Sequence, residues 1–169
     1  MLESLDDLDW PENVKLMQKN WIGKSNGAEI KYQIIGTKDF LTTFSTRPDT
    51  IFGVSFLALS PNHPMAIEIS KENEKIKKFL EVCKESKAAE ADMAKADKLG
   101  IDTGIRAMHP ITKEEIPIWI GNFVLLDYGT GVVMGVPGHD SRDFEFASKY
   151  NLDIKPVSYT HLTLPTIVS

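Results

Sequence analysis

Two polar segments, far apart in the sequence, carry the side chains best suited to chemistry. The first is TTFSTRPDT, from Thr42 to Thr50, and the second is GTGVVMGVPGHDSRDFEFA, from Gly129 to Ala147. Each pattern predicts a strand that runs into a turn and then into the start of a helix. Hydroxyl and carboxylate groups at such turns can reach a bound ligand, so these two segments are the candidate functional sites.

The first segment offers three hydroxyls near one predicted turn. A strand ends at Ser45 and Thr46, Arg47 and Pro48 turn the chain, and Thr50 follows. Because a residue before proline avoids the helical region, we expect the Arg47 backbone to be extended. The hydroxyls can hydrogen-bond a polar substrate or a water, and a threonine methyl can act as a steric wall. An edge strand with a capped turn explains the same pattern about equally well.

The second segment joins an apolar strand, residues 131–136, to two carboxylates. Glycine inside a strand, here Gly135, often marks the close approach of a ligand or another backbone. Asp140 can cap the following helix, and Asp143 lies three residues further on. The helix dipole and orphan N–H groups of a first turn keep a carboxylate ionised, which suits Asp143 to bind an ammonium group. Capping alone explains Asp140 well and Asp143 less well.

Other kinds of site have weak signals. The run from Gly129 to Gly131 lacks the spacing of a dinucleotide-binding loop, and the sequence has no Walker motif. His63, His109 and His139 lack metal-ligand spacing, so no metal site is predicted. His139 beside Asp140 is a weak candidate for a general base, and no Ser-His-Asp arrangement with a nucleophile elbow is visible.

Composition predicts a soluble, single-domain protein. The chain has 169 residues, of which 42% are hydrophobic and 25% are charged. A chain of this length can bury about two-thirds of its unfolded surface. No apolar run approaches the roughly 20 residues of a membrane helix, and the acidic start is unlike a signal peptide. The single cysteine, Cys83, favours a reducing, cytoplasmic setting. A net charge of −5 argues against wrapping a nucleic-acid duplex, although a pocket for the end of one remains compatible.

The elements that must position these side chains form an α+β pattern. An alternating strand at 28–34, a strand at 41–45 and an almost wholly apolar strand at 54–59 precede a charged helical region from Ser60-Pro61 to about Leu99. Four short strands, a helix at 140–150 and a last strand at 154–157 follow. The fold predicted is a curled, mostly antiparallel sheet or barrel with flanking helices. The four short strands are 105–108, 116–120, 123–127 and 131–136.

The sequence divides into three regions. Residues 1–25 contain a predicted helix that begins near Asp9 and a linker, and residues 26–157 form the main domain. Residues 158–169 contain no Lys, Arg, Asp or Glu and are rich in Ser and Thr. We expect this tail to be a foreign extension.

The two motifs resemble those of the editing domain of bacterial-type leucyl-tRNA synthetases. The family's threonine-rich motif stands here as Thr42 to Thr50, and its second motif as Gly129 to Asp143. The likeness covers about residues 7 to 157. The valyl and isoleucyl enzymes carry related motifs, but Arg-Pro-Asp-Thr followed by Ile-Phe-Gly is similar to the leucyl version. Shorter matches are Trp21 to Ser25, Asp102 to Gly104, His109-Pro110 and Ile116 to Trp119.

The resemblance implies a domain inserted into the catalytic domain of a parent synthetase, with residues 1–25 leading into it and the fold continuing past Val157. It implies hydrolysis of the ester bond of tRNA(Leu) that carries a wrong amino acid, such as isoleucine or norvaline. One methylene is worth only about 1–3 kcal/mol in a pocket, so synthesis alone cannot reject near-cognates. The alternatives are a non-catalytic module that binds the tRNA acceptor end or a partner protein, and the editing domain of a valyl or isoleucyl enzyme.

The resemblance also implies roles for individual residues. Asp143 would bind the α-ammonium group, and Thr50 would exclude correctly attached leucine. Ser45 and Thr46 would hold the terminal adenosine or the attacking water; Ser45 replaces the family's usual threonine and keeps its hydroxyl. The remaining substrate-binding residues implied are Arg47, Asp49, Tyr128, Met134, Val136, His139 and Asp140.

The resemblance implies no metal or organic cofactor for editing. ATP would bind only in the parent's catalytic domain, whose His-Ile-Gly-His and Lys-Met-Ser-Lys-Ser signatures do not occur in this sequence. The expected partners are the 3′ acceptor end of tRNA(Leu) with its amino acid and the parent's catalytic domain. No membrane partner is expected, and the protein is expected to be a monomer.

Overall fold

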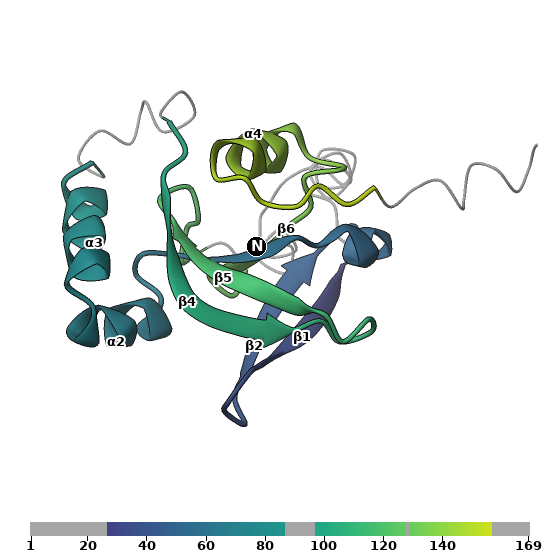
Figure 1. Ribbon diagram of the computed structural model, residues 1–169, viewed down its shortest axis with the longest axis horizontal. Helices are drawn as coiled ribbons and strands as arrows, with labels where there is room; N and C mark the ends of the chain where they lie inside the picture. The colour runs from purple at the N-terminus through teal and green to yellow at the C-terminus, as the bar shows by residue number, and fades with distance from the viewer. Residues whose placement is uncertain (1–26, 87–96, 128, 157–169) are drawn as a thin grey trace, which may run out of the picture.

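One six-stranded mixed sheet organises the chain. The computed structural model describes residues 27–86, 97–127 and 129–156 (Figure 1). The strand order is β2-β1-β4-β5-β3-β6, and every neighbouring pair is antiparallel except β3 and β5. The α+β class and the mostly antiparallel sheet are confirmed. The strands are β1 (Ala28–Ile34), β2 (Phe40–Ser45), β3 (Phe56–Leu59), β4 (Gly100–Met108), β5 (Glu115–Gly121) and β6 (Val132–Gly135).

The sheet is curled, so its two edge strands approach each other. The Thr130 hydroxyl, just before β6, donates a hydrogen bond to the carbonyl oxygen of Thr42 in β2. The ladder of β4 with β5 is interrupted between Asp102 and Arg106, where Gly104 has φ 78°. Such an irregularity bends a strand and increases its twist. The long curved β4–β5 pair is visible in Figure 1.

Apolar clusters cover both faces of the sheet. In β3, Leu57 and Leu59 belong to the larger cluster, while Phe56 and Ala58 belong to the smaller one with Phe146 of α4. All four β3 residues are buried, as the continuous apolar run predicted. In β1, Ile30, Tyr32 and Ile34 are buried in alternation, which confirms the half-buried strand.

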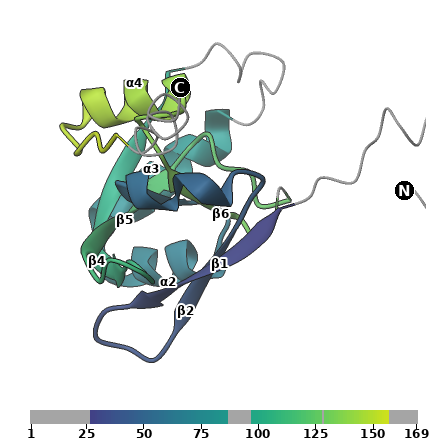
Figure 2. The same cartoon turned by 90° about the vertical axis from the view of Figure 1, so that its right-hand side faces the viewer.

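The helices lie at two places on the sheet. α2 (Pro64–Glu72) and α3 (Glu74–Ser86) lie together at one end of the sheet and pack in the larger cluster (Figure 1, Figure 2). α4 (Ser141–Lys149) packs in the smaller cluster on the opposite face. Lysines of both helices are exposed, and Cys83 of α3 is buried. The exposed lysines include Lys71, Lys75, Lys77 and Lys78.

The charged helical region was predicted too long at both ends. At its start, the Ser60 carbonyl accepts from the His63 N–H at 2.9 Å, and the Ser60 hydroxyl accepts from the Asn62 N–H at 3.3 Å. These bonds form a turn, so α2 begins only at Pro64, with His63 Nδ1 as its cap. Residues 97–99 are not helical, and residues 87–96 lie outside the described part.

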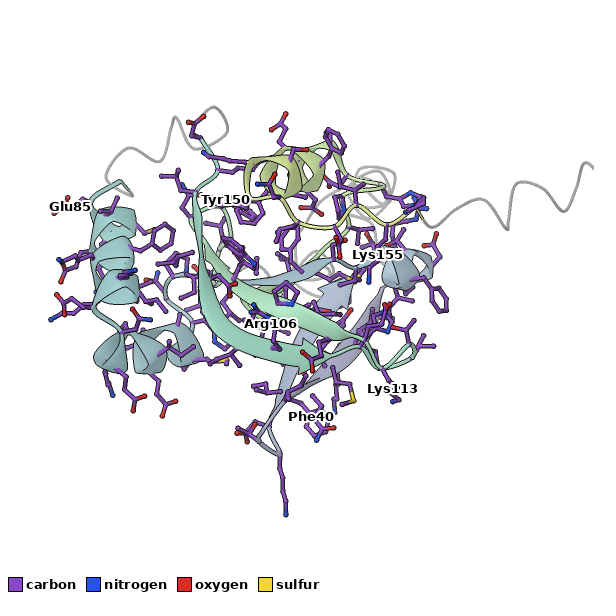
Figure 3. All side chains as sticks on the ribbon, viewed as in Figure 1. Phe40, Glu85, Arg106, Lys113, Tyr150 and Lys155 are labelled. Carbon is purple, nitrogen blue, oxygen red and sulfur yellow. The ribbon has the colours of Figure 1, made fainter. Side chains whose placement is uncertain are left out.

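Two predicted strands are wrong. Residues 123–127 form a turn after β5, in which the Val124 N–H donates to the Gly121 carbonyl at 3.3 Å. Phe123 and Val124 of this segment pack in the cluster around Phe146, where the Phe123 and Phe146 ring centroids are 5.2 Å apart, and do not pair in the sheet. Residues 154–156 are also irregular; an ion pair of 2.9 Å between Lys155 and Glu114 attaches them to the β4–β5 loop. Figure 3 shows Lys155 at the same end of the molecule as Lys113 of that loop.

Some predictions fall on residues that the structure does not describe. The helix near Asp9, the region 1–25, the tail 158–169 and Tyr128 all lie outside the described residues. Within the described part, none of the helices combines the length and the hydropathy that crossing a bilayer requires.

Phe146→Ala should reduce the free energy of unfolding by about 3–5 kcal/mol, because its buried ring joins α4 to the sheet. The ring lies 5.0 Å from that of Phe56 and 5.6 Å from that of Trp119. Phe144→Ala, on the same helix but 49% exposed, is the matched control and should change the free energy by less than about 0.5 kcal/mol. Urea unfolding measures both, and equal losses would contradict the assigned packing of α4.

Candidate functional site

The first polar segment forms a tight turn immediately after β2. Pro48–Gly53 is a short 3-10 helix, η2, that begins after Arg47. Arg47 has φ −124° and ψ 64°, so it avoids the helical region as expected but is not fully extended. The reason is local hydrogen bonding: its N–H donates to the Ser45 hydroxyl at 3.0 Å, and its carbonyl accepts from the Thr50 N–H at 3.1 Å.

Thr50 has a fixed side chain. Its hydroxyl donates to the Arg47 carbonyl at 2.8 Å, and the residue is 5% exposed. A threonine has three χ1 rotamers, and this bond selects one of them, which also fixes the direction of the methyl group. The hydroxyl is therefore engaged within the turn, and the methyl is the part of Thr50 that is available to shape a pocket.

The remaining polar side chains of this turn are partly or fully exposed. Ser45 is half-buried, Thr46 is exposed, and Arg47 and Asp49 form an exposed bidentate ion pair at 2.9 and 3.0 Å. The hydrogen bond from Arg47 holds the pKa of Asp49 below its usual value, with a smaller contribution from His139. Within the described residues, neither Ser45 nor Thr46 hydrogen-bonds Asp143 directly.

The second polar segment places Asp143 against the end of β6. Its Oδ2 accepts a hydrogen bond of 2.9 Å from the backbone N–H of Val136, the buried residue after the strand. Asp140, in contrast, caps α4 by accepting from the Arg142 N–H at 2.8 Å. The two aspartates therefore differ as the sequence indicated: Asp140 is the cap, and Asp143 reaches outside its helix.

The pKa of Asp143 is raised, whereas a helix start alone would lower it. Burial raises the pKa of Asp143 to about 6, and the hydrogen bond from Val136 opposes this only in part. The helix start does not dominate because the carboxylate leaves its own helix and is desolvated beside an apolar strand end. Asp143 is half-buried, and a carboxylate with one backbone partner can still accept hydrogen bonds from a ligand.

Gly135 allows a close approach, but not the predicted one. Its cross-strand partner is Phe56, and a Cβ at position 135 would collide with the Phe56 ring. The glycine therefore accommodates a core side chain and neither a ligand nor another backbone. Met134, which precedes it, is half-buried, and its sulfur accepts from the Tyr32 hydroxyl at 3.6 Å.

The fold brings the two segments together. η2 leads directly into β3, which pairs with β6, and the Ser55 N–H donates to the Gly135 carbonyl at 3.0 Å. The exposed His139, in the turn after β6, lies close enough to Asp49 to affect its pKa. The Thr42–Thr130 hydrogen bond links the beginnings of both segments. In Figure 1, η2 is the short blue helix at the right, at the end of the sheet away from α2 and α3.

Two buried side chains at this place were missed as site residues. His109, at the end of β4, contacts the carbonyl of Ile51 in η2 at 2.9 Å from Nε2. Tyr32 lies against His109 and Met134 at once. His109 was assigned no role because it lacks metal-ligand spacing, and Tyr32 is indistinguishable from any other inward residue of an alternating strand.

Other features of the described residues lie elsewhere. They contain no group of three or more His, Cys, Asp or Glu side chains that could hold a metal ion. A shallow groove on α2 and α3 is lined by Ile67, Lys71, Lys77 and Lys84 among others. It shares no residue with the two polar segments and lies at the other end of the sheet (Figure 1).

Comparison with known proteins identifies the family. A family model described as leucyl-tRNA synthetase, editing domain, matches residues 19–163. A leucine–tRNA ligase of Alkalilimnicola ehrlichii is 52% identical over 158 residues, which are 93% of this chain and 18% of that protein. A crystal structure of the ternary complex of Agrobacterium radiobacter K84 agnB2 LeuRS with tRNA and LeuAMS matches with TM-score 0.73 and 34% identity, covering 93% of this chain and 19% of that one.

The chain thus spans about a fifth of the length of each relative. The matched family model covers most of the chain and includes both polar segments. On this evidence the chain belongs to the leucyl-tRNA synthetase editing-domain family.

Proposed function

We propose that this domain hydrolyses the ester bond of tRNA(Leu) charged with a wrong amino acid, such as isoleucine or norvaline. The single observation that supports this most is the Asp143 carboxylate, half-buried at the end of an apolar strand with one backbone hydrogen bond. An α-ammonium group is the ligand that such a carboxylate fits, because an opposite charge compensates its lost hydration. An ester-linked amino acid keeps its α-ammonium free, whereas a peptide bond consumes it.

The two halves of the site would have different tasks. Asp143 would hold the ammonium group, and the side chains of Met134 and Val136 would contact the amino acid. Thr50 would restrict the space for its side chain, and the Ser45 and Thr46 hydroxyls would orient the terminal adenosine or the attacking water. Water would add to the ester carbonyl carbon, and the adenosine oxygen would leave with a proton, which gives free amino acid and uncharged tRNA.

The assignment of tRNA(Leu) rests on the family and on the relative whose structure includes tRNA. We propose that the acceptor end enters between η2 and the turn after β6. With a net charge of −5, the chain supplies little phosphate neutralisation, so most tRNA backbone contacts would come from the parent's other domains. Editing would need no cofactor, ATP would serve only the parent's catalytic domain, and monomeric state and a cytoplasmic setting stay predictions.

The family match favours a leucyl over a valyl or isoleucyl parent. The deciding experiment is a deacylation panel of isoleucyl-, norvalyl- and leucyl-tRNA(Leu). It uses this chain and a chimera in which it replaces the matched segment of the Alkalilimnicola ligase. Hydrolysis of the first two with protection of the third is expected. Binding of terminal-adenosine analogues without any hydrolysis would instead identify a non-catalytic module.

Asp143→Asn should reduce kcat/KM for isoleucyl-tRNA(Leu) roughly 10- to 150-fold, because a hydrogen bond to a charged group contributes about 1.5–3 kcal/mol. The amide oxygen can still accept from Val136, so the fold is preserved. Glu145→Gln, on the same helix with a side chain 74% exposed, is the matched control and should retain the rate. Equal rates for both variants and the unsubstituted chain would refute the ammonium site.

Thr50→Ala should raise hydrolysis of leucyl-tRNA(Leu) roughly 10- to 200-fold, the range that one methyl group is worth in a pocket. Two further variants separate the methyl from the hydroxyl. Thr50→Val keeps the methyl and should still protect leucine, while Thr50→Ser keeps the bond to Arg47 and should not. The opposite order would show that the hydroxyl, and not steric exclusion, provides the selectivity.

The pH dependence should follow Asp143. Its ionised form binds the ammonium group, so kcat/KM should fall as pH decreases through the pKa of about 6. It should also fall at higher pH, where the α-ammonium group of the substrate loses its proton. The measurement is isoleucyl-tRNA(Leu) deacylation across that range, corrected for spontaneous hydrolysis. The same inflection in Asp143→Asn would assign it to another group.

Stability should show the reverse trend. Because the folded pKa is raised above the ordinary value of 3.8, the charged carboxylate costs stability at neutral pH, and this cost disappears as pH falls below that value. Asp143→Asn should therefore be at least as stable as the unsubstituted chain at neutral pH. A lower free energy of unfolding would show that its loss of activity is a folding defect.

A further inference from the structure

We propose that His109 is a positioning residue for selectivity: its Nε2–H fixes η2, and so the Thr50 methyl, at the distance from the pocket that excludes leucine. This inference rests on the proposed editing function and deepens it. It assigns the position of the Thr50 methyl to a hydrogen bond from the loop after β4, not to the threonine-rich segment alone.

The hydrogen bonds around His109 define its tautomer. Its Nδ1 accepts from the N–H groups of Ile111 at 3.2 Å and Thr112 at 3.0 Å. A ring nitrogen that accepts carries no proton, so in the neutral imidazole the proton is on Nε2. Nε2 lies 2.9 Å from the Ile51 carbonyl oxygen and is therefore the donor. His109 is 2% exposed, so water does not compete for this bond.

The hydrogen bond between His109 and Ile51 connects η2 to the end of β4. Thr50 is bonded to Arg47 within its own turn, and the Arg47–Asp49 pair is likewise internal. Among the described residues, the His109–Ile51 contact is the hydrogen bond that joins residues 48–53 to a distant element. Short 3-10 segments have poor hydrogen-bond geometry of their own, so an external anchor determines where the turn lies.

Aromatic packing holds the imidazole on two sides. Tyr32 of β1 meets it edge-on, with ring centroids 6.3 Å apart and an interplanar angle of 82°. Phe52 of η2 stacks on it at 6.4 Å and 26°. The Tyr32 hydroxyl also donates to Met134 of β6. His109 thus connects the turn that carries the proposed wall to the strand that lines the proposed pocket.

Two substitutions test the proposal because they keep different halves of the imidazole. His109→Gln places an amide N–H near Nε2 and can restore the bond to Ile51. His109→Asn places an oxygen near Nδ1, which preserves the bonds from Ile111 and Thr112 but loses the one to Ile51. Both remove the ring, so loss of packing is matched between them.

The readout is the ratio of leucyl- to isoleucyl-tRNA(Leu) hydrolysis by the chimera described above. A displacement of about 1 Å can change a rate a hundredfold, so we expect His109→Asn to raise this ratio at least about tenfold. We expect His109→Gln to stay within about twofold of the unsubstituted chain. General destabilisation would lower both rates together and leave the ratio unchanged.

A double-mutant cycle shows whether His109 acts through Thr50. In a Thr50→Ala background the wall is already gone, so His109→Asn should change the ratio little; contacting residues give such non-additive effects. An additive effect, equal ratios in the Asn and Gln variants, or failure of both variants to fold would overturn the inference. Absence of isoleucyl-tRNA hydrolysis in the unsubstituted chimera would instead show that the proposed function itself is wrong.

Discussion

The hydrogen bond from the Val136 N–H to the Asp143 carboxylate is the interaction on which the site depends. It joins the first turn of α4 to the end of β6 and keeps a charge-bearing group beside apolar side chains. Burial destabilises the ionised carboxylate, which raises its pKa to about 6. A ligand cation would offset this cost, which is why the proposed function assigns an ammonium group to Asp143.

The curl of the sheet turns two distant segments into one site. β3 pairs with β6, so the turn that enters β3 and the turn that leaves β6 lie at the same edge. The larger cluster supports this edge from one face, and the aromatic cluster around Phe146 supports it through α4 from the other. The position of the Thr50 turn relative to Asp143 is therefore a property of the whole domain and not of either motif.

Local patterns predicted what local forces determine. The alternation of Ile30, Tyr32 and Ile34 and the cap at Asp140 follow from side-chain periodicity and helix-end chemistry, and both are confirmed. The segment 123–127 was mistaken for a strand because its apolar residue Phe123 resembles a strand residue. In the fold, Phe123 packs against Phe146 of α4, which is distant in the sequence. The raised pKa of Asp143 follows from its burial in the folded domain, and the His109–Ile51 bond joins residues 58 positions apart, so no spacing rule shows either.

The most direct measurement is an NMR titration of the Asp143 side-chain carboxyl in this chain, with and without a non-hydrolysable isoleucyl-adenosine analogue. The free chain should titrate near the pKa of about 6. An analogue with a free α-ammonium group should lower that pKa by about 1–3 units, whereas its N-acetylated form should not. An unchanged pKa with bound analogue, or equal shifts with both forms, would contradict the assignment of Asp143 as the ammonium-binding carboxylate.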